Sequence, residues 1–253
     1  GCAFGTTEGT LSDICGAGVH ITEFLLTGDG NAMPDYDNVN YVIQFGTQAG
    51  TATRHGYNMT VETFAERRAN GLRHVVVDPH MGGSGEKADL WVPIRPGTDA
   101  ALALAIAYVL VHEEGTIDID FLKNRTNSPS LVNVETGRIL FDEATGKSLY
   151  MDADGTPKTY DTCADPQLEG EFEVNGTPCK TGFTLYKEHI AKYTPEYQEQ
   201  ITTVPADTVR QIAKELGASA CIGQTTTIDG VELPYRPAAV DAFSGITRHK
   251  HTW

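Results

Sequence analysis

The sequence predicts an α/β fold: a parallel sheet with helices on both faces, similar to dinucleotide-binding folds, that carries a β-hairpin-rich insertion. The stretch from 72 to 99 contains two short apolar runs, 75–77 and 90–94, and turns with Pro and Gly end both of them. Short apolar runs bounded in this way are typical of strands buried in a parallel sheet. A further strand, 41–45, is followed by a small-residue loop and a helical stretch. Strand, helix and strand therefore follow one another as in a βαβ unit.

The elements before this stretch are a helix, a strand and a second helix. Ser12 and Asp13 can cap a helix that runs to about residue 26, and a polar, turn-rich segment separates it from the strand at 41–45. A helix is expected from about 54 to 70. The small-residue loop at 46–50 has two interpretations. It can bring backbone amides close to a phosphate at the N-terminus of the helix, or it can be a plain tight connection.

An almost wholly apolar helix, 98–112, follows the strand at 90–94, and Thr98 and Asp99 are candidate caps for it. An acid where a parallel strand ends lies at the carboxyl edge of the sheet, where α/β folds bind ligands. On chemistry alone, the stretch is equally well explained as an ordinary strand–turn–strand–helix unit with a helix cap.

The remaining chain divides into a hairpin segment and a returning α/β segment. Thr-Gly and Asp-Gly pairs punctuate short runs between 126 and 181, so this segment is predicted to be a β-hairpin insertion. Its Asp152-Ala-Asp154-Gly run faintly resembles a calcium loop, but a hairpin turn explains it better. The predicted domains are the α/β core 1–125, the insertion 126–181 and the returning segment 182–253. In the returning segment, helices are expected at 182–191, at 195–200 and from 204 to a stop at Gly217. Strands are expected at 220–222 and 238–243, and a hairpin turn at Asp229-Gly230.

Composition excludes several classes of partner. The 253 residues include 34 acids and 19 bases, for a net charge of -15, which argues against a nucleic-acid surface or a basic membrane patch. The five cysteines contain no CxxC pair, so an iron–sulfur or zinc site within this chain is not expected. The sequence leaves open whether Cys163 and Cys179 form a disulfide. The longest apolar run is too short to cross a bilayer. The chain starts without Met, and we interpret it as a fragment or a processed piece.

Two motifs carry a family resemblance. VVVDP at 75–79 and KADLWVPIRPGTDAALALAIAYVL at 87–110 resemble the core of the dimethyl sulfoxide reductase family of molybdopterin oxidoreductases. The resemblance extends over 12–125 and more loosely over 182–249, and the hairpin segment has no clear match. Cys15 lies where many members of the family carry a ligand to molybdenum or tungsten. A soft thiolate suits such a metal, whereas without the resemblance Cys15 is a small buried hydrophobe.

The resemblance also implies which loops hold a molybdopterin guanine dinucleotide that carries Mo or W. One loop would line a pyrophosphate, a second would lie near the guanosine ribose and a third would hold the guanine. A further segment would lie beside the pterin and the metal, where His249 joins Cys15 as a catalytic candidate; without the resemblance, His249 and His251 are solvated side chains. The pyrophosphate loop consists of Gly46, Thr47 and Gln48, and the ribose loop consists of Asp78, Pro79 and His80. The guanine loop consists of Gly97, Thr98 and Asp99, and the segment beside the pterin and the metal contains Gly245, Arg248 and His249. The loop at 46–56 departs from the family pattern, so its register is open.

The function that the resemblance implies is that of part of a catalytic subunit, inactive alone, that performs two-electron redox or oxygen-atom transfer in anaerobic respiration. The expected partners are the remainder of the catalytic polypeptide, a membrane anchor and an iron–sulfur electron-transfer subunit. An iron–sulfur cluster is expected only in upstream sequence, and the compartment, periplasm or cytoplasm of a bacterium or archaeon, is left open. The alternatives are a nucleotide-binding α/β module without a redox metal and a non-redox hydratase or transhydroxylase of the same family.

Overall fold

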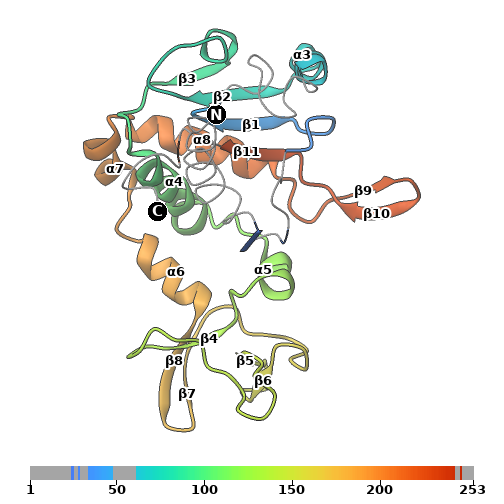
Figure 1. The fold of residues 1–253 in the computed structure, drawn as a ribbon, viewed down its shortest axis with the longest axis vertical. Coiled ribbons are helices and arrows are strands. Elements are labelled where there is room, and N and C mark those ends of the chain that lie inside the picture. Colours follow the sequence, from blue (N-terminus) through green and yellow to red (C-terminus); the bar gives the residue numbers. More distant parts are fainter. Residues whose placement is uncertain (1–23, 26–27, 29–33, 48–60, 243–245, 247–253) are drawn as a thin grey trace, which may run out of the picture. The chain divides into compact units, whose positions relative to one another are not determined.

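The computed structural model of the chain describes residues 24–25, 28, 34–47, 61–242 and 246 (Figure 1). The chain divides into two compact units, Gly1–Val109 together with Tyr193–Trp253, and Leu110–Lys192. The predicted domain boundaries after 125 and after 181 stay a prediction.

The first unit is built on a four-stranded parallel sheet with the strand order β11-β1-β2-β3 (Figure 1). The strands are β1 (Tyr41–Phe45), β2 (Arg73–Val77), β3 (Leu90–Val92) and β11 (Ala238–Ala242). In the register, Val42 lies opposite His74 on β2 and Ala239 on β11. All five residues of β1 are buried, as expected for a central strand of a parallel sheet. The predicted parallel sheet is confirmed.

Helices cover both faces of this sheet. Successive side chains of a strand point to opposite faces. Val42 belongs to a buried cluster that includes Phe64 of α3 (Val61–Ala69). Its neighbour Tyr41 points the other way, where its hydroxyl donates to the carbonyl oxygen of Ile212 in α8 (Ala206–Ser219) at 3.3 Å. On that same face, the Arg73 guanidinium pairs with Glu215 of α8 at 3.2 Å.

Helix α4 (Asp99–Tyr108) packs against α7 (Pro195–Thr202) and α8. It continues as a π-helical turn, Val109–Glu113, so the predicted helix exists but changes its winding near its end. The predicted cap by Thr98 is wrong: its side chain makes no capping bond, and its hydroxyl instead donates to the Arg95 carbonyl oxygen at 2.7 Å. A short 3₁₀ helix, Gly85–Lys87, connects β2 and β3.

The returning segment confirms most predicted elements and corrects two. Strands β9 (Thr225–Ile228) and β10 (Val231–Pro234) form an antiparallel hairpin on Asp229-Gly230, as predicted. However, α8 runs through Gly217 instead of stopping there. The strand predicted at 220–222 is absent, because Cys221 adopts a left-handed conformation with φ of 49° in a turn. The Arg236 guanidinium donates to the carbonyl oxygen of Cys221 at 3.1 Å and so holds this turn.

The second unit is a small α+β body with antiparallel sheets. The predicted β-hairpins are confirmed, because β7 pairs with β8 and β5 pairs with β6. Its core is formed by Leu131, Met151, Val174 and Cys179. Cys163 and Cys179 are both free thiols, so the disulfide between them that the sequence left open is not formed. The elements are α5 (Ile119–Arg125), β4 (Leu131–Asn133), β5 (Leu149–Met151), β6 (Pro157–Thr159), β7 (Glu171–Val174), β8 (Thr177–Thr181) and α6 (Gly182–Ile190).

Within the part of the chain that the structure describes, no helix combines the length and the apolar character needed to cross a membrane.

Candidate functional site

The candidate site lies at the carboxyl edge of the parallel sheet. Because the four strands run in the same direction, their carboxyl ends meet at one edge. The chain proceeds from β1 to β2 and β3 on one side, whereas β11 pairs with the other side of β1. The point where the strand order reverses is the place where open α/β sheets bind ligands. The sheet edge beside β1 is therefore the expected ligand site.

The first loop at this edge begins at Gly46. Its amide donates to the Val77 carbonyl oxygen at 3.0 Å, which joins the end of β1 to the end of β2. The φ of Gly46 is 55°, a left-handed conformation that glycine adopts without strain. Thr47, the next residue, is buried. The start of this loop thus has a fixed backbone with no side chain at Gly46, so a ligand can approach the main chain closely.

The second loop begins at Asp78 and is tied down by three hydrogen bonds. The Asp78 amide donates to the Val92 carbonyl oxygen of β3 at 3.2 Å. The Asp78 carboxylate accepts from the backbone amide of His80 at 2.8 Å, which closes a tight turn. The Trp91 indole Nε1 donates to the Asp78 carbonyl oxygen at 2.9 Å. Pro79 and His80 are exposed on this rigid turn, so their side chains are available to a ligand.

The third loop leads into α4. Gly97 is left-handed, with φ of 78°, and Thr98 is held by its hydrogen bond to Arg95. The Arg95 amide in turn donates to the Thr202 carbonyl oxygen at the end of α7 at 3.0 Å. Asp99, the first residue of α4, is 7% exposed. The positive end of the helix dipole favours a carboxylate at this position.

The structure therefore brings together eight predicted site residues on three consecutive loops of one sheet edge. They are Gly46, Thr47, Asp78, Pro79, His80, Gly97, Thr98 and Asp99. The predicted residues Cys15, Gln48, Gly245, Arg248 and His249 lie outside the described residues. The segment with the last three begins directly after β11, whose carboxyl end lies beside that of β1.

The backbone and side-chain groups that these loops present are suited to bind a nucleotide. Gly46 and Gly97 are left-handed and carry no side chain of their own, which suits the close approach of a phosphate or a ring. Asp78 and Asp99 offer carboxylate oxygens, which accept hydrogen bonds from ribose hydroxyls or from the N–H groups of a base. Among the described residues, no group of three or more His, Cys, Asp and Glu side chains is placed to hold a metal ion. The described part of the edge is suited to the nucleotide portion of a cofactor.

Sequence reasoning missed Trp91 as a part of this site. The sequence places it only in a short buried strand, yet its indole holds the Asp78 turn. A partly buried indole N–H needs an acceptor, and that need was the available signal. The acceptor itself, the Asp78 carbonyl oxygen in the turn after β2, becomes apparent only from the pairing of β2 with β3.

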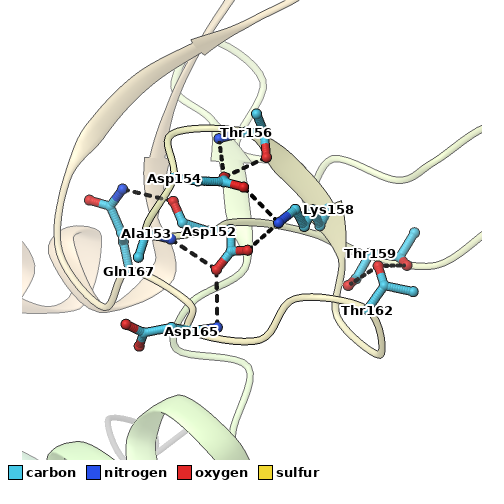
Figure 2. A network of polar contacts seen from close by, with 9 residues as sticks. All are labelled: Asp152, Ala153, Asp154, Thr156, Lys158, Thr159, Thr162, Asp165 and Gln167. Carbon is cyan, nitrogen blue, oxygen red and sulfur yellow. Dashed lines mark hydrogen bonds and ion pairs between the residues drawn. The ribbon is translucent and has the colours of Figure 1, made fainter.

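The acidic run at Asp152 forms a separate polar network in the second unit (Figure 2). Asp152 accepts from the amides of Ala153 and Asp165, at 2.9 and 3.0 Å, and pairs with the Lys158 ammonium. Asp154 pairs with the same ammonium at 2.8 Å. The side-chain hydrogen bond from Lys158 is the main cause that lowers the pKa of Asp154 to about 2. The run forms the turn between β5 and β6, and both carboxylates serve to close it.

Comparison with known proteins identifies relatives of the chain. No protein-family model matches it. It is 36% identical over 203 residues to a sulfite dehydrogenase subunit of Allochromatium vinosum, an alignment that covers 74% of this chain and 20% of that protein. It is 33% identical over 189 residues to a putative dimethyl sulfoxide reductase catalytic subunit of Halobacterium salinarum, an alignment that covers 68% of this chain and 22% of that protein. Dimethyl sulfoxide reductase DmsA of Escherichia coli is 31% identical over 194 residues, covering 76% and 19%.

The fold also resembles a solved structure. Acetylene hydratase from Pelobacter acetylenicus matches with a TM-score of 0.54 and 18% identity, over 92% of this chain and 22% of that one. This likeness concerns the fold alone. The chain spans about a fifth of the length of the curated relatives that it matches. The resemblance in the two sequence motifs is confirmed, and the chain belongs to the dimethyl sulfoxide reductase family of molybdopterin oxidoreductases.

Proposed function

We propose that this chain is part of the catalytic subunit of a molybdopterin oxidoreductase and that its sheet edge binds a molybdopterin guanine dinucleotide carrying molybdenum or tungsten. Three neighbouring loops with nucleotide-binding chemistry at the carboxyl ends of β1, β2 and β3 carry this proposal. Family membership supports it, because these enzymes use a molybdenum-containing pterin cofactor. When bound, the metal and pterin supply two-electron redox or oxygen-atom transfer, while the protein binds and orients them.

Each described loop has a distinct role in the proposal. The backbone at Gly46 and Thr47, with Gln48 following, would face a pyrophosphate of the cofactor. The rigid turn at 78–80 would lie near the guanosine ribose, with the half-buried Asp78 carboxylate as the acceptor. Gly97 would allow the guanine to approach, and Asp99 would accept from its ring N–H and amino group. A carboxylate suits this edge of guanine because its two oxygens lie in one plane.

The remaining predicted residues keep their roles as proposals from the family resemblance. Cys15 would ligate the metal as a thiolate. His249 would lie beside the metal, and Gly245 and Arg248 beside the pterin. An Arg at this position offers charge-assisted hydrogen bonds to a phosphate or an oxyanion.

The partners are proposed on the same basis. Several relatives carry names that describe single subunits of their enzymes, which identifies each of them as one member of a complex. We assign the chain to the catalytic member of such a complex, with a membrane anchor and an iron–sulfur electron-transfer subunit as its partners. An iron–sulfur cluster in the upstream part of the same catalytic polypeptide would connect the metal to these partners.

Replacement of Cys15 in the intact enzyme tests the redox assignment. Cys15→Ala should abolish turnover and change the spectrum of the metal centre, while bound guanine nucleotide is retained, because the thiolate holds only the metal. Cys163→Ala is the matched control. Burial raises the pKa of that thiol to about 11, so it is a poor ligand at neutral pH, and its loss should leave turnover unchanged. Unchanged turnover in Cys15→Ala would contradict the assignment of Cys15 as the metal ligand.

A further inference from the structure

Three polar side chains lie fully inside the core on the face of the sheet that α3 covers. Gln44 and His74 are 0% exposed, and Asp241 is 2% exposed. Burial of polar groups is costly unless they are hydrogen-bonded. The His74 Nε2 bonds to the Gln44 Oε1 at 2.9 Å, and the Asp241 carboxylate accepts from the Tyr36 hydroxyl at 2.7 Å. An apolar core would need none of these bonds, so the polar groups specify a particular geometry.

The Phe64 side chain connects the two hydrogen-bonded pairs, which lie on one face of the sheet. The Phe64 side chain packs edge-on against Tyr36, with centroids 5.4 Å apart, and edge-on against His74, with centroids 5.0 Å apart. On the sheet, Gln44 lies directly opposite Asp241 in the parallel register, so their side chains leave the same face. We name these five side chains, Tyr36, Gln44, Phe64, His74 and Asp241, the buried ring. It connects β1, β2, β11 and α3.

The protonation state of His74 fixes the direction of one bond. Burial is the main cause that lowers its pKa to about 4, with the Arg68 charge adding to the effect. The imidazole is therefore neutral at neutral pH. Because the Gln44 Oε1 only accepts, the Nε2 of His74 carries the proton. The ring then holds the Gln44 side chain in one orientation.

Two members of the buried ring lie immediately before segments that are predicted to hold the cofactor. Gln44 is followed by Phe45 and then by Gly46, where the first loop begins. Asp241 is followed by Ala242, the last residue of β11, after which the segment with Gly245, Arg248 and His249 begins. The two strands are neighbours at the point where the strand order reverses. A displacement of either polar side chain would move the carboxyl end of its strand.

We infer that the buried ring is a positioning device that holds the ends of β1 and β11 in register and thereby places the start of the first loop, Gly46 and Thr47, beside the reversal point. This inference rests on the proposed function. Tyr36, Gln44, His74 and Asp241 are positioning residues, since they act through the loops that follow them. Preorganised loops bind a ligand more tightly because less ordering accompanies binding.

The experiment compares two Tyr→Phe variants of the intact protein. Tyr36→Phe removes the hydroxyl that holds Asp241. Tyr41→Phe removes a buried hydroxyl from the same sheet, but on the opposite face, where it bonds to α8. The first readout is guanine nucleotide released from the purified protein. The second is amide hydrogen exchange in cofactor-free protein, followed in peptides that cover 44–47 and 240–242.

Tyr36→Phe should lower nucleotide content at least threefold and accelerate exchange in both peptides at least fivefold, while Tyr41→Phe should change neither. If Tyr36→Phe does not fold, Gln44→Met removes the acceptor of His74 and should give the same two changes. The inference is overturned if the wild type holds guanine nucleotide and the ring variant matches Tyr41→Phe in both readouts. A wild type without guanine nucleotide would instead overturn the proposed function.

Discussion

The indole nitrogen of Trp91 donates a hydrogen bond to the carbonyl oxygen of Asp78 at 2.9 Å. This bond connects β3 to the turn that follows β2, the strand beside it. It adds to the backbone bond between the Asp78 amide and Val92. The turn that presents the Asp78 carboxylate is therefore fixed from the neighbouring strand, and its rigidity is independent of any ligand.

Replacing Trp91 by Phe removes this bond and retains an aromatic ring. The free energy of unfolding should fall by about 1 kcal/mol, the usual net value of one intramolecular hydrogen bond, measured by urea denaturation. Guanine nucleotide content should fall as well, because the Asp78 turn loses its anchor. Tyr150→Phe is the control, since the Tyr150 hydroxyl bonds to the Thr126 carbonyl oxygen in the other unit. It should lower stability by a similar amount and leave the nucleotide content unchanged.

Replacing Asp99 by Asn tests the proposed guanine contact. The amide keeps the size of the side chain but presents a donor where guanine also presents donors, so the intact protein should hold at least tenfold less guanine nucleotide. Asp207→Asn is the matched control, because Asp207 occupies the first turn of α8. It removes a carboxylate from a helix N-terminus without touching the proposed site. Equal nucleotide content in the two variants would exclude Asp99 as the guanine acceptor.

The buried His74 predicts a specific loss of stability in acid. Its pKa is about 4 in the folded protein, below the ordinary value of about 6.5. Between these values the unfolded chain binds the proton and the folded protein does not. The free energy of unfolding is therefore unaffected by the titration of His74 above pH 6.5. It decreases as the pH falls from 6.5 toward 4, by about 3 kcal/mol in total. NMR titration of the imidazole resonances checks this directly, and a His74 midpoint near 6.5 would contradict it.

In the second unit, Lys158 controls the titration of Asp154. The Lys158 ammonium lowers the pKa of Asp154 to about 2, with help from the Thr156 hydroxyl and amide. Lys158→Met should raise this pKa toward the ordinary value of about 3.9, because the largest stabilising contact of the carboxylate is lost. The two Thr156 bonds remain, so the return should be incomplete. Carboxyl carbon NMR measures the change, and an Asp154 that still titrates near 2 would show that Lys158 has no such role.

Local patterns in the sequence predicted the elements of the sheet well. The runs at 41–45 and 238–243 are short, largely apolar and bounded by turn residues, and the structure has strands at 41–45 and 238–242. The same criterion failed at 220–222, where three residues are too few to separate a strand from a turn that buries part of its side chains. The capping prediction failed at Thr98, whose hydroxyl donates to the Arg95 carbonyl oxygen and accepts from no amide of the first turn of α4. The orientation of this hydroxyl depends on the conformation of the loop.

The candidate site was predictable in part, because each of its loops directly follows a strand. Once β1, β2 and β3 are parallel neighbours, the loops must share an edge. The buried ring could not be predicted, because Tyr36 and Asp241 are 205 positions apart in the chain. Their contact requires β11 to return beside β1, and no local pattern encodes that pairing. The trace of it in the sequence was the polar identity of Gln44, His74 and Asp241 within otherwise apolar strands.

Above all, we propose that this sheet edge holds a molybdopterin guanine dinucleotide. The most direct test is the content of molybdenum, tungsten and guanine nucleotide in the intact protein that carries this chain, purified in its native form. Elemental mass spectrometry would give the metal, and acid hydrolysis followed by chromatography would give the nucleotide. We predict molybdenum or tungsten together with guanine nucleotide, and Asp99→Asn should reduce the nucleotide. A well-folded protein with neither metal nor guanine nucleotide would contradict the proposal.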